Sequence, residues 1–470
     1  MSAVGNTLRS IVSVFPSVVK PVRKKSLNER LIWTVGALLL YLVMSQIPLY
    51  GVASGMEDQM SYTSIIFATA QGTLVHLGIG PIVTAGLVLQ LLKGADIIPL
   101  NFKDPADRAL FSSSTKVLAL FITFVEGIAF MIGGQFGTGL SGSTQVIIIA
   151  QLVLAGFVIL LLDELVQKGW GIGSGISLFI AAGVAQQVFW SIFSVLPTGD
   201  GYFGVIPYFV QSLLNGNVGS AVMRSNNLPS LITLFLTLAI IALIVYTEGI
   251  RIELPITSTK MRGFQGTYPI KLLYVSVLPV ILTGALMANI MFFSQFIWSR
   301  YNPASNVSYL NWIGIYNPEN PSSGAIGGLA YYISPARGIQ SLSAEPLHVV
   351  TYVLFFMIMC VIFSRIWVEV AGLGPSKVAE NLLGANVQVP GFRNRKSSVE
   401  IILNKYIPVI TIIGGALMGL LAAGSDILGI FGSGTGILLM VSITLNFYQQ
   451  LMKEQLETMM PQLAGLLGKG

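Results

Sequence analysis

Two glycine-rich stretches interrupt the most apolar parts of the chain, and glycine-rich loops are one way in which proteins bind phosphate. The first reads GIGSGISLF at residues 171–179, and the second reads FGSGTGILLM at residues 431–440. A phosphate-binding loop follows a strand and carries a lysine after its glycines. Neither stretch has such a lysine. The glycines are better explained as places where apolar helices approach each other closely.

Few groups within the apolar stretches could carry out catalysis. Glu126 stands in the middle of an apolar run, in FITFVEGIAF, whereas His76 and His348 lie at the edges of such runs. An intramembrane protease would need paired aspartates, an HExxH helix or a serine with a histidine. The chain has none of these patterns. We therefore expect that the protein is not an enzyme and binds neither a cofactor nor a metal.

Composition places the chain in a membrane. Hydrophobic residues make up 53% of it and charged residues only 10%, and the mean hydropathy is +0.76. In soluble domains about a quarter of the residues are charged. Apolar runs of about the 20 residues that cross a bilayer lie near residues 31–49, 75–92, 114–134, 144–162, 172–192, 229–247, 274–297, 348–368, 406–423 and 427–447. The run at 61–71 is too short to cross, which predicts a re-entrant helix.

Basic residues indicate how the chain lies in the membrane. If the N-terminus is cytoplasmic, the outward segments hold only Arg224, Arg300 and Arg337 of the 26 lysines and arginines. Cytoplasmic loops of membrane proteins are enriched in these residues. We therefore expect both termini to be cytoplasmic in a multi-pass protein.

The glycine-rich stretches also belong to a repeat. They fall in the fifth and tenth apolar runs, while GPIVTAG at residues 80–86 and LPVILTGA at residues 278–285 fall in the second and seventh. A unit with an odd number of spans that occurs twice must be inverted in its second copy, and such repeats place a functional path between the halves. The sequence predicts an all-α integral membrane protein with ten transmembrane helices in two inverted five-helix halves. The predicted segments are 1–30 (cytoplasmic), 31–192 (first half), 193–228 (external loop), 229–447 (second half) and 448–470 (cytoplasmic tail).

Five motifs in this order resemble the SecY family, the channel subunit of the Sec protein translocon, in its archaeal and eukaryotic branch. They are LGIGPIVTAG (77–86), GIGSGISLFIAAGVAQQ (171–187), GIRIELPIT (249–257), PVILTGALMANI (279–290) and GSGTGILLMVSI (432–443). The resemblance covers nearly the whole chain. It implies a channel that translocates secretory polypeptides across the cytoplasmic membrane and inserts membrane proteins laterally into it. The outside loops at 193–228 and 299–347 look longer than those of the family, so the resemblance implies no role for their residues.

The resemblance implies three sites. A ring of apolar side chains at the waist of the pore would consist of Ile79, Val83, Ile176, Ile180, Ile281 and Leu439. A polar cluster at the lateral gate, where spans two and three meet spans seven and eight, would consist of Thr84, Glu126 and Asn289. A plug helix under the ring, at 61–71, would include Tyr62, Ile65, Ile66 and Phe67. Alternatively, the polar cluster is purely structural and the short helix rests on lipid.

The resemblance also implies partners. These are a SecE-type single-span subunit, a small beta-type subunit, signal sequences, membrane lipid and a ribosome with its nascent chain. Ribosome docking would involve Arg251, Lys260, Arg262, Arg393, Arg395 and Lys396 in two long inside loops, although basic residues there also serve topology alone. A secondary transporter is the alternative function, since some have inverted five-span repeats. It would need ionisable residues at mid-membrane, where only Glu126 qualifies.

Overall fold

The computed structural model describes most of the chain. The described residues are 16–23, 25–52, 69–70, 72–94, 97–98, 105–132, 136, 140–199, 201–224, 228–258, 265–275, 277–303, 305–318, 324–336, 338–384, 387–388 and 396–459. The plug residues Tyr62, Ile65, Ile66 and Phe67 and the basic residues Lys260, Arg262, Arg393 and Arg395 lie outside them.

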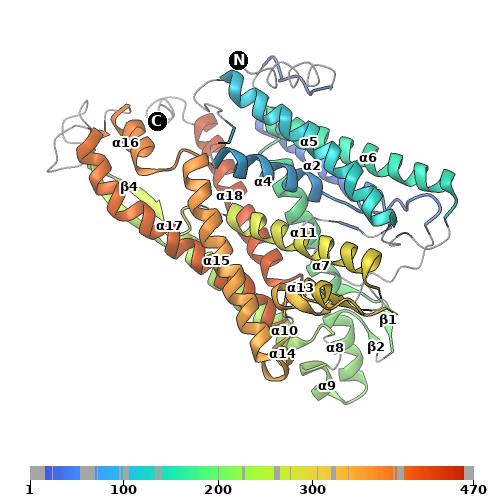
Figure 1. The fold of residues 1–470 in the computed structure, drawn as a ribbon. Coiled ribbons are helices and arrows are strands. Elements are labelled where there is room, and N and C mark those ends of the chain that lie inside the picture. The colour runs from blue at the N-terminus through green and yellow to red at the C-terminus, as the bar shows by residue number, and fades with distance from the viewer. Residues whose placement is uncertain are drawn as a thin grey trace.

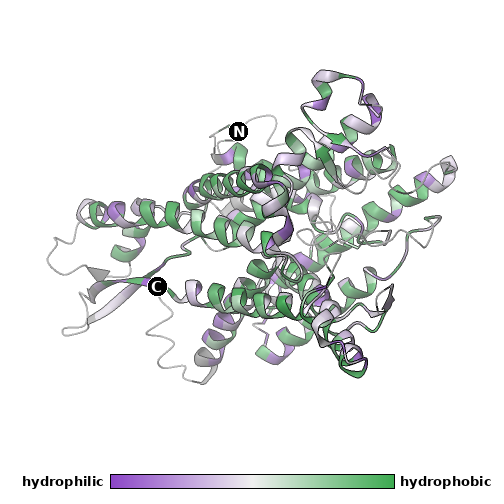
Figure 2. Cartoon of the chain, turned by 90° about the horizontal axis from the view of Figure 1, so that it is seen from below, coloured by the Kyte–Doolittle hydropathy of each residue, from purple (hydrophilic) through white to green (hydrophobic). Residues whose placement is uncertain are grey.

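Ten long helices in the described residues match the ten predicted spans in order. They are α2 (Leu27–Met44), α4 (Gly80–Gly94), α5 (Pro105–Ile132), α6 (Gly142–Leu165), α7 (Gly175–Phe193), α10 (Leu231–Gly249), α11 (Leu278–Tyr301), α15 (Pro346–Val370), α17 (Lys396–Ile427) and α18 (Gly434–Met459). Figure 1 shows them running roughly side by side, and Figure 2 shows hydrophobic residues along most of their lengths. The predicted helical membrane fold is confirmed.

Length and composition make eight of these helices able to cross a membrane unaided. The other two are α4 and α18. The first is a shorter apolar helix, and the second carries the polar residues Asn446, Gln449 and Gln450 in its latter part. Both lie within the bundle, where α4 packs on α5 and α18 packs on α7. Most residues of α4 and of the stretch 434–443 of α18 are buried or half-buried in protein, whereas Gln449 and Gln450 lie on the exposed latter part of α18.

Serine residues explain where three of the helices begin. Ser26, Ser141 and Ser230 stand in extended conformation directly before α2, α6 and α10. Each side chain accepts a hydrogen bond from the backbone N–H three residues later. This arrangement satisfies one of the four N–H groups that the first turn of a helix leaves without a partner. The apolar run then continues the helix across the membrane.

The two halves of the chain meet along two seams. On one, α7 of the first half packs on α18 of the second, and on the other, α4 packs on α11 and α15. One large cluster of buried apolar side chains includes residues of all five helices. The interface between the halves is therefore the centre of the molecule.

The inside loop after α10 is a β-hairpin, which the sequence analysis did not predict. Strands β3 (Arg251–Ser258) and β4 (Gln265–Lys271) pair antiparallel from Arg251 with Lys271 to Thr257 with Gln265, and β7 (Val387–Gln388) adds to β3. Leu254 and Ile270 are buried against α16 (Pro375–Gly384) and α17. Burial raises the pKa of the Tyr268 hydroxyl in β4. The hairpin is thus anchored on the second half.

The loops on the opposite side from the chain ends are structured too. After α7 come β1 (Pro197–Thr198), β2 (Gly201–Tyr202), α8 (Val205–Leu214) and α9 (Val218–Val222). After α11 come α12 (Ser308–Asn311), β5 (Ile315–Tyr316), β6 (Ala325–Gly327), α13 (Gly328–Ile333) and α14 (Ile339–Ala344). Figure 1 shows these elements at the far end of the bundle from the marks for the termini.

Candidate functional site: a hydrophobic ring and a lateral seam

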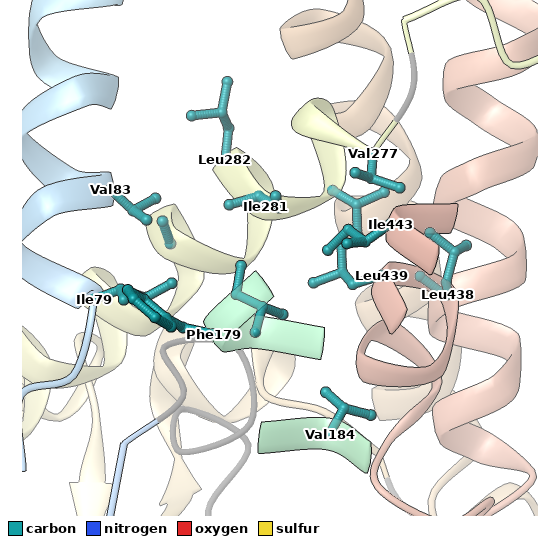
Figure 3. Packing of buried hydrophobic residues seen from close by; sticks show 14 of the residues in the cluster. Ile79, Val83, Phe179, Val184, Val277, Ile281, Leu282, Leu438, Leu439 and Ile443 are labelled. Atoms are coloured by element: carbon teal, nitrogen blue, oxygen red, sulfur yellow. The ribbon is translucent and has the colours of Figure 1, made fainter. Parts of the chain in front are cut away.

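The six residues predicted to form the ring all belong to the large apolar cluster or pack against it. Ile79, Val83, Ile180, Ile281 and Leu439 are buried members, and Ile176 is partly buried against the cluster. Figure 3 shows Val83 on α4, with Ile79 just before this helix, Ile281 on α11 and Leu439 on α18. Both halves of the chain therefore supply side chains to one apolar cluster.

All six side chains stand near the start of their helices. Ile79 directly precedes α4, and the other five fall within the first six residues of α4, α7, α11 or α18. Val83 and Ile281 both follow a proline by two residues, and Ile180 and Leu439 both follow a glycine, Gly175 or Gly434, by five residues. Corresponding positions of the two repeats therefore supply corresponding side chains.

Buried aspartates determine where α7 and α18 begin. Asp163, near the end of α6, accepts a hydrogen bond of 3.0 Å from the backbone N–H of Ile176. Asp426, near the end of α17, accepts one of 2.7 Å from the N–H of Gly434. A carboxylate at the N-terminus of a helix satisfies its free N–H groups and matches its dipole. The preceding helix thus positions the ring-bearing helix in each half.

Asp426 makes further contacts within the second half. Its Oδ2 accepts hydrogen bonds from the Tyr352 hydroxyl at 2.7 Å and from Thr435 Oγ1 at 3.2 Å. Tyr352 belongs to α15, so this carboxylate joins α15, α17 and α18. Leu439 lies one turn beyond Thr435 on α18. The height of Leu439 in the bundle therefore depends on the Asp426 contacts.

The glycines that prompted the phosphate hypothesis permit this close approach. A Cβ at Gly175 would stand 2.6 Å from Asp163 Cα, and one at Gly434 would stand 2.3 Å from the Ala422 carbonyl oxygen. Real Cβ atoms do not approach other atoms so closely. The glycine-rich stretches are thus packing contacts between consecutive helices, as the sequence predicted.

The predicted polar cluster at the lateral gate is partly assembled. Asn289 Nδ2 on α11 donates a hydrogen bond of 3.1 Å to Thr84 Oγ1 on α4, and one of 2.8 Å to the Ala285 carbonyl. Within the described residues no hydrogen bond joins Glu126 to either side chain. Glu126 lies half-buried on α5, beside α4. Two of the three predicted residues therefore bridge the seam directly.

An aromatic pair, which sequence reasoning missed, also closes this seam. Phe130 on α5 and Phe292 on α11 have ring centroids 4.6 Å apart, and the His76 ring lies edge-on against Phe130 at 5.4 Å. Phe130 is four residues beyond Glu126, and Phe292 is three beyond Asn289. Helix residues at these spacings share a face. This spacing could have indicated the pair from the sequence, because it places each phenylalanine ring next to a residue of the predicted polar cluster.

The predicted docking residues are described only in part. Arg251 begins β3 with an exposed guanidinium, 3.7 Å from the Glu253 carboxylate. Lys396 begins α17.

Across the described part of the chain, no group of three or more histidine, cysteine, aspartate or glutamate residues could hold a metal ion.

Comparison with known proteins agrees with this geometry. The sequence profile of the SecY family matches residues 73–448, and that of the plug domain of Sec61p matches residues 39–72. The latter range includes the whole segment predicted to be a plug, 61–71.

Similar proteins match over almost their full length. The protein translocase subunit SecY of Pyrococcus furiosus is 38% identical over 97% of this chain and 97% of its own. The protein transport protein Sec61 subunit alpha of Dictyostelium discoideum is 38% identical over 96% of both chains.

Solved structures show the same likeness. A structure described as that of a protein conducting channel superposes with a TM-score of 0.84 at 34% identity, covering 97% of this chain and 99% of that one. Sec61 in the canine ribosome-channel complex from the endoplasmic reticulum gives a TM-score of 0.81 at 34% identity, with the same coverage. The chain therefore belongs to the SecY family.

Proposed function

We propose that this protein is a protein-conducting channel, which passes secretory polypeptides through the ring and releases apolar segments through the α4–α11 seam. The observation that carries the proposal is that six aliphatic side chains from both halves belong to one buried apolar cluster or pack against it. The likeness to a structure described as a protein conducting channel supports it.

The ring suits a pore that must stay closed to ions and yet accept a chain. Aliphatic side chains offer no ligand to replace the hydration shell of an ion, and a narrow apolar constriction can exclude water. They also offer no specific contact to any one residue of a passing polypeptide. Because the four helices that bear the ring come from both halves, small movements between the halves would widen it.

The seam suits lateral release into lipid. A hydrogen bond between membrane helices contributes only about 0.6 kcal/mol on average, and an aromatic pair about 0.5–1.5 kcal/mol. A signal sequence brings roughly ten apolar residues, each of which favours lipid by about 0.3–0.6 kcal/mol. The signal sequence therefore outweighs the Asn289–Thr84 and Phe130–Phe292 contacts. Binding at the seam would shift the population toward the open state.

The basic inside face suits a ribosome that delivers the chain. We infer that both termini and the β3–β4 hairpin are cytoplasmic and that the protein lies in the cytoplasmic membrane, because basic residues gather on that side. Arg251 is exposed at the base of the hairpin, where it could meet ribosomal phosphates. The proposal also includes a plug at 61–71, which closes the pore, and the basic residues of 259–264 and 389–395, which contact the ribosome. A SecE-type subunit and a small beta-type subunit are its further partners.

Reconstitution tests this function. Purified protein with a SecE-type subunit is placed in proteoliposomes and offered ribosomes that carry a nascent secretory precursor. We expect the precursor to become resistant to added protease until detergent dissolves the vesicles. A precursor with a disrupted signal sequence is the control and should stay accessible. If both precursors stay accessible to the protease although ribosomes bind, the protein and its SecE-type subunit do not form a protein-conducting channel.

A further inference from the structure

The loop between α11 and α15 exposes a group of large apolar side chains on the side opposite the chain ends. Trp312 is 80% exposed and Tyr309 75% exposed. Ile326, Leu329 and Tyr332 are exposed as well. We call these five residues the aromatic patch. Single exposed apolar residues are ordinary, but a cluster of them marks an interaction surface.

The aromatic patch is held firmly on α11. The Leu329 N–H donates a hydrogen bond of 2.8 Å to the Trp312 carbonyl, which ties the two strips of the loop together. Ser294 Oγ on α11 donates to the Ile313 carbonyl at 3.2 Å, and the Tyr316 hydroxyl donates to the Met291 carbonyl at 3.2 Å. The exposed side chains therefore sit on a defined platform at the end of a gate helix.

The aromatic patch continues the lipid-facing surface of α15. Exposed apolar residues of α15 form one stripe, which consists of Leu347, Val350, Leu354, Ile358 and Ile362. Thr351 Oγ1, next to this stripe, donates a hydrogen bond of 3.1 Å to the Tyr332 carbonyl. A groove of about 420 Å³ between them is lined by Ile326, Tyr331, Tyr332, Glu345, Pro346, Leu347 and His348. The stripe and the patch thus meet at one groove, which is mostly apolar and carries the Glu345 carboxylate at its edge.

The chemistry of the aromatic patch fits the boundary between lipid and water. Its tryptophan and two tyrosines each join an apolar ring to a polar N–H or O–H group, and these residue types gather where headgroups meet acyl chains. In the described stretches 305–318 and 324–336 there is no charged side chain. The aromatic patch therefore lacks the charges that would bind a charged partner. Its polar N–H and O–H groups would lack hydrogen-bond partners in the dry interior of the bilayer.

We propose that the aromatic patch lies in the headgroup layer of the leaflet opposite the termini, with the lipid surface as its ligand. The patch then anchors the adjacent ends of α11 and α15 at a fixed depth. These helices form one side of the seam against α4. The anchor lets them move apart from α4 within the membrane plane without rising or sinking. The proposal depends on the membrane fold alone, and holds whether or not the protein translocates polypeptides.

Depth-dependent quenching tests this placement. A bimane label is attached at Trp312→Cys, and at Asn217→Cys as a matched control, because Asn217 is an exposed polar residue on the same side. The single native cysteine, Cys360, is buried and does not compete for label. The labelled full-length proteins are placed in vesicles of equal amounts of phosphatidylcholine and phosphatidylglycerol. Quenchers are a lipid with a nitroxide at its headgroup or high on its chain, and aqueous iodide.

We expect the lipid nitroxides to quench most of the emission at position 312 and iodide to quench little of it, with the reverse at position 217. Iodide quenching at both positions, without lipid quenching at 312, would overturn the proposal. Protection of position 312 from both kinds of quencher would overturn it as well, since protein would then cover the patch. Intrinsic fluorescence gives a second readout, because the emission that wild type has and Trp312→Phe lacks should be quenched by the same nitroxide lipids.

Discussion

The Asn289 side chain on α11 donates a hydrogen bond of 3.1 Å to Thr84 Oγ1 on α4, so a polar contact joins the second half of the chain to the first at the lateral seam. Thr84 directly follows the ring residue Val83. The closure of the seam and the closure of the ring therefore involve adjacent positions on one helix. Near the chain ends an ion pair between Arg30 and Glu454 joins α2 to α18.

Loss of the Asn289–Thr84 hydrogen bond should favour the open seam. We expect Asn289→Leu to lower the signal-sequence hydrophobicity that export requires. Losing a hydrogen bond of ~0.6 kcal/mol corresponds to about a threefold increase in the ratio of open to closed seam. The measurement is export of a graded series of signal sequences. Thr84→Val removes the other partner and should shift the threshold alike, and the double variant should add nothing further. Superimposable threshold curves in all variants would reduce the contact to a structural detail.

The Phe130–Phe292 pair should act in the same direction. Phe292→Ala removes about 0.5–1.5 kcal/mol of aromatic contact across the seam and should also let weaker signal sequences pass. Phe121→Ala is the matched control, since Phe121 stands on α5 like Phe130 but is 62% exposed. Export of weak signal sequences is compared between the two variants. An equal effect of both changes would mean that general loss of apolar surface, rather than the seam contact, is responsible.

Asp426 should control leakage through the ring. Asp426→Ala leaves the Gly434 N–H and the Tyr352 hydroxyl without this acceptor, at about 1–3 kcal/mol for each buried group. Because α18 then loses its cap, we expect Leu439 to shift and the resting ion conductance in planar bilayers to rise. Asp426→Asn keeps an acceptor oxygen and should leak less, and Tyr352→Phe should leak least. A resting conductance that stays at the wild-type value in Asp426→Ala, while thermal stability falls, would show that the cap is structural only.

Docking of the ribosome should depend on Arg251 and on salt. Arg251→Glu should weaken ribosome binding and reduce the steepness with which binding falls as salt rises, because one fewer phosphate contact releases fewer ions. Lys377→Glu is the control, since Lys377 is a basic residue of α16 that is not among the predicted docking residues and, like Arg251, has a carboxylate neighbour, Glu380 at 3.1 Å. Binding is measured by co-sedimentation over a salt series. If Arg251→Glu leaves the curve unchanged, the basic residue at this position serves topology alone.

The helices could be predicted from the sequence because their signals are local, whereas the ring positions were taken from motifs shared with the SecY family and stay a prediction. Each span is a continuous apolar run, and the ring positions stand at fixed distances from prolines and glycines, such as Pro81 and Gly175. These distances determine where a side chain lies once the helix begins. The Asn289–Thr84 contact could be predicted from motifs in the same way.

Contacts between distant segments could not be predicted. Phe292 and Phe293 are both phenylalanines in an apolar run, yet the first lies against Phe130 across the seam and the second is exposed. Only the packing of neighbouring helices separates these two environments. The β3–β4 hairpin was missed because Pro255 and Pro269 stand within its strands, and proline argues against a strand in sequence. Glu126 was expected to bond with Thr84 and Asn289, but position in the sequence does not determine how a long side chain is oriented.

The passage of a polypeptide through the ring is tested most directly by crosslinking. A photoreactive residue is placed at Ile180, which is buried in the apolar cluster, and for comparison at Phe235, which is 68% exposed on α10. Ribosomes arrested on a secretory chain are bound to each reconstituted channel and illuminated. We expect a crosslink between the arrested chain and position 180, its loss when the chain is released before illumination, and no crosslink at position 235. An arrested, protease-protected chain that crosslinks to neither position, or equally to both, would contradict the assignment of the ring as the translocation path.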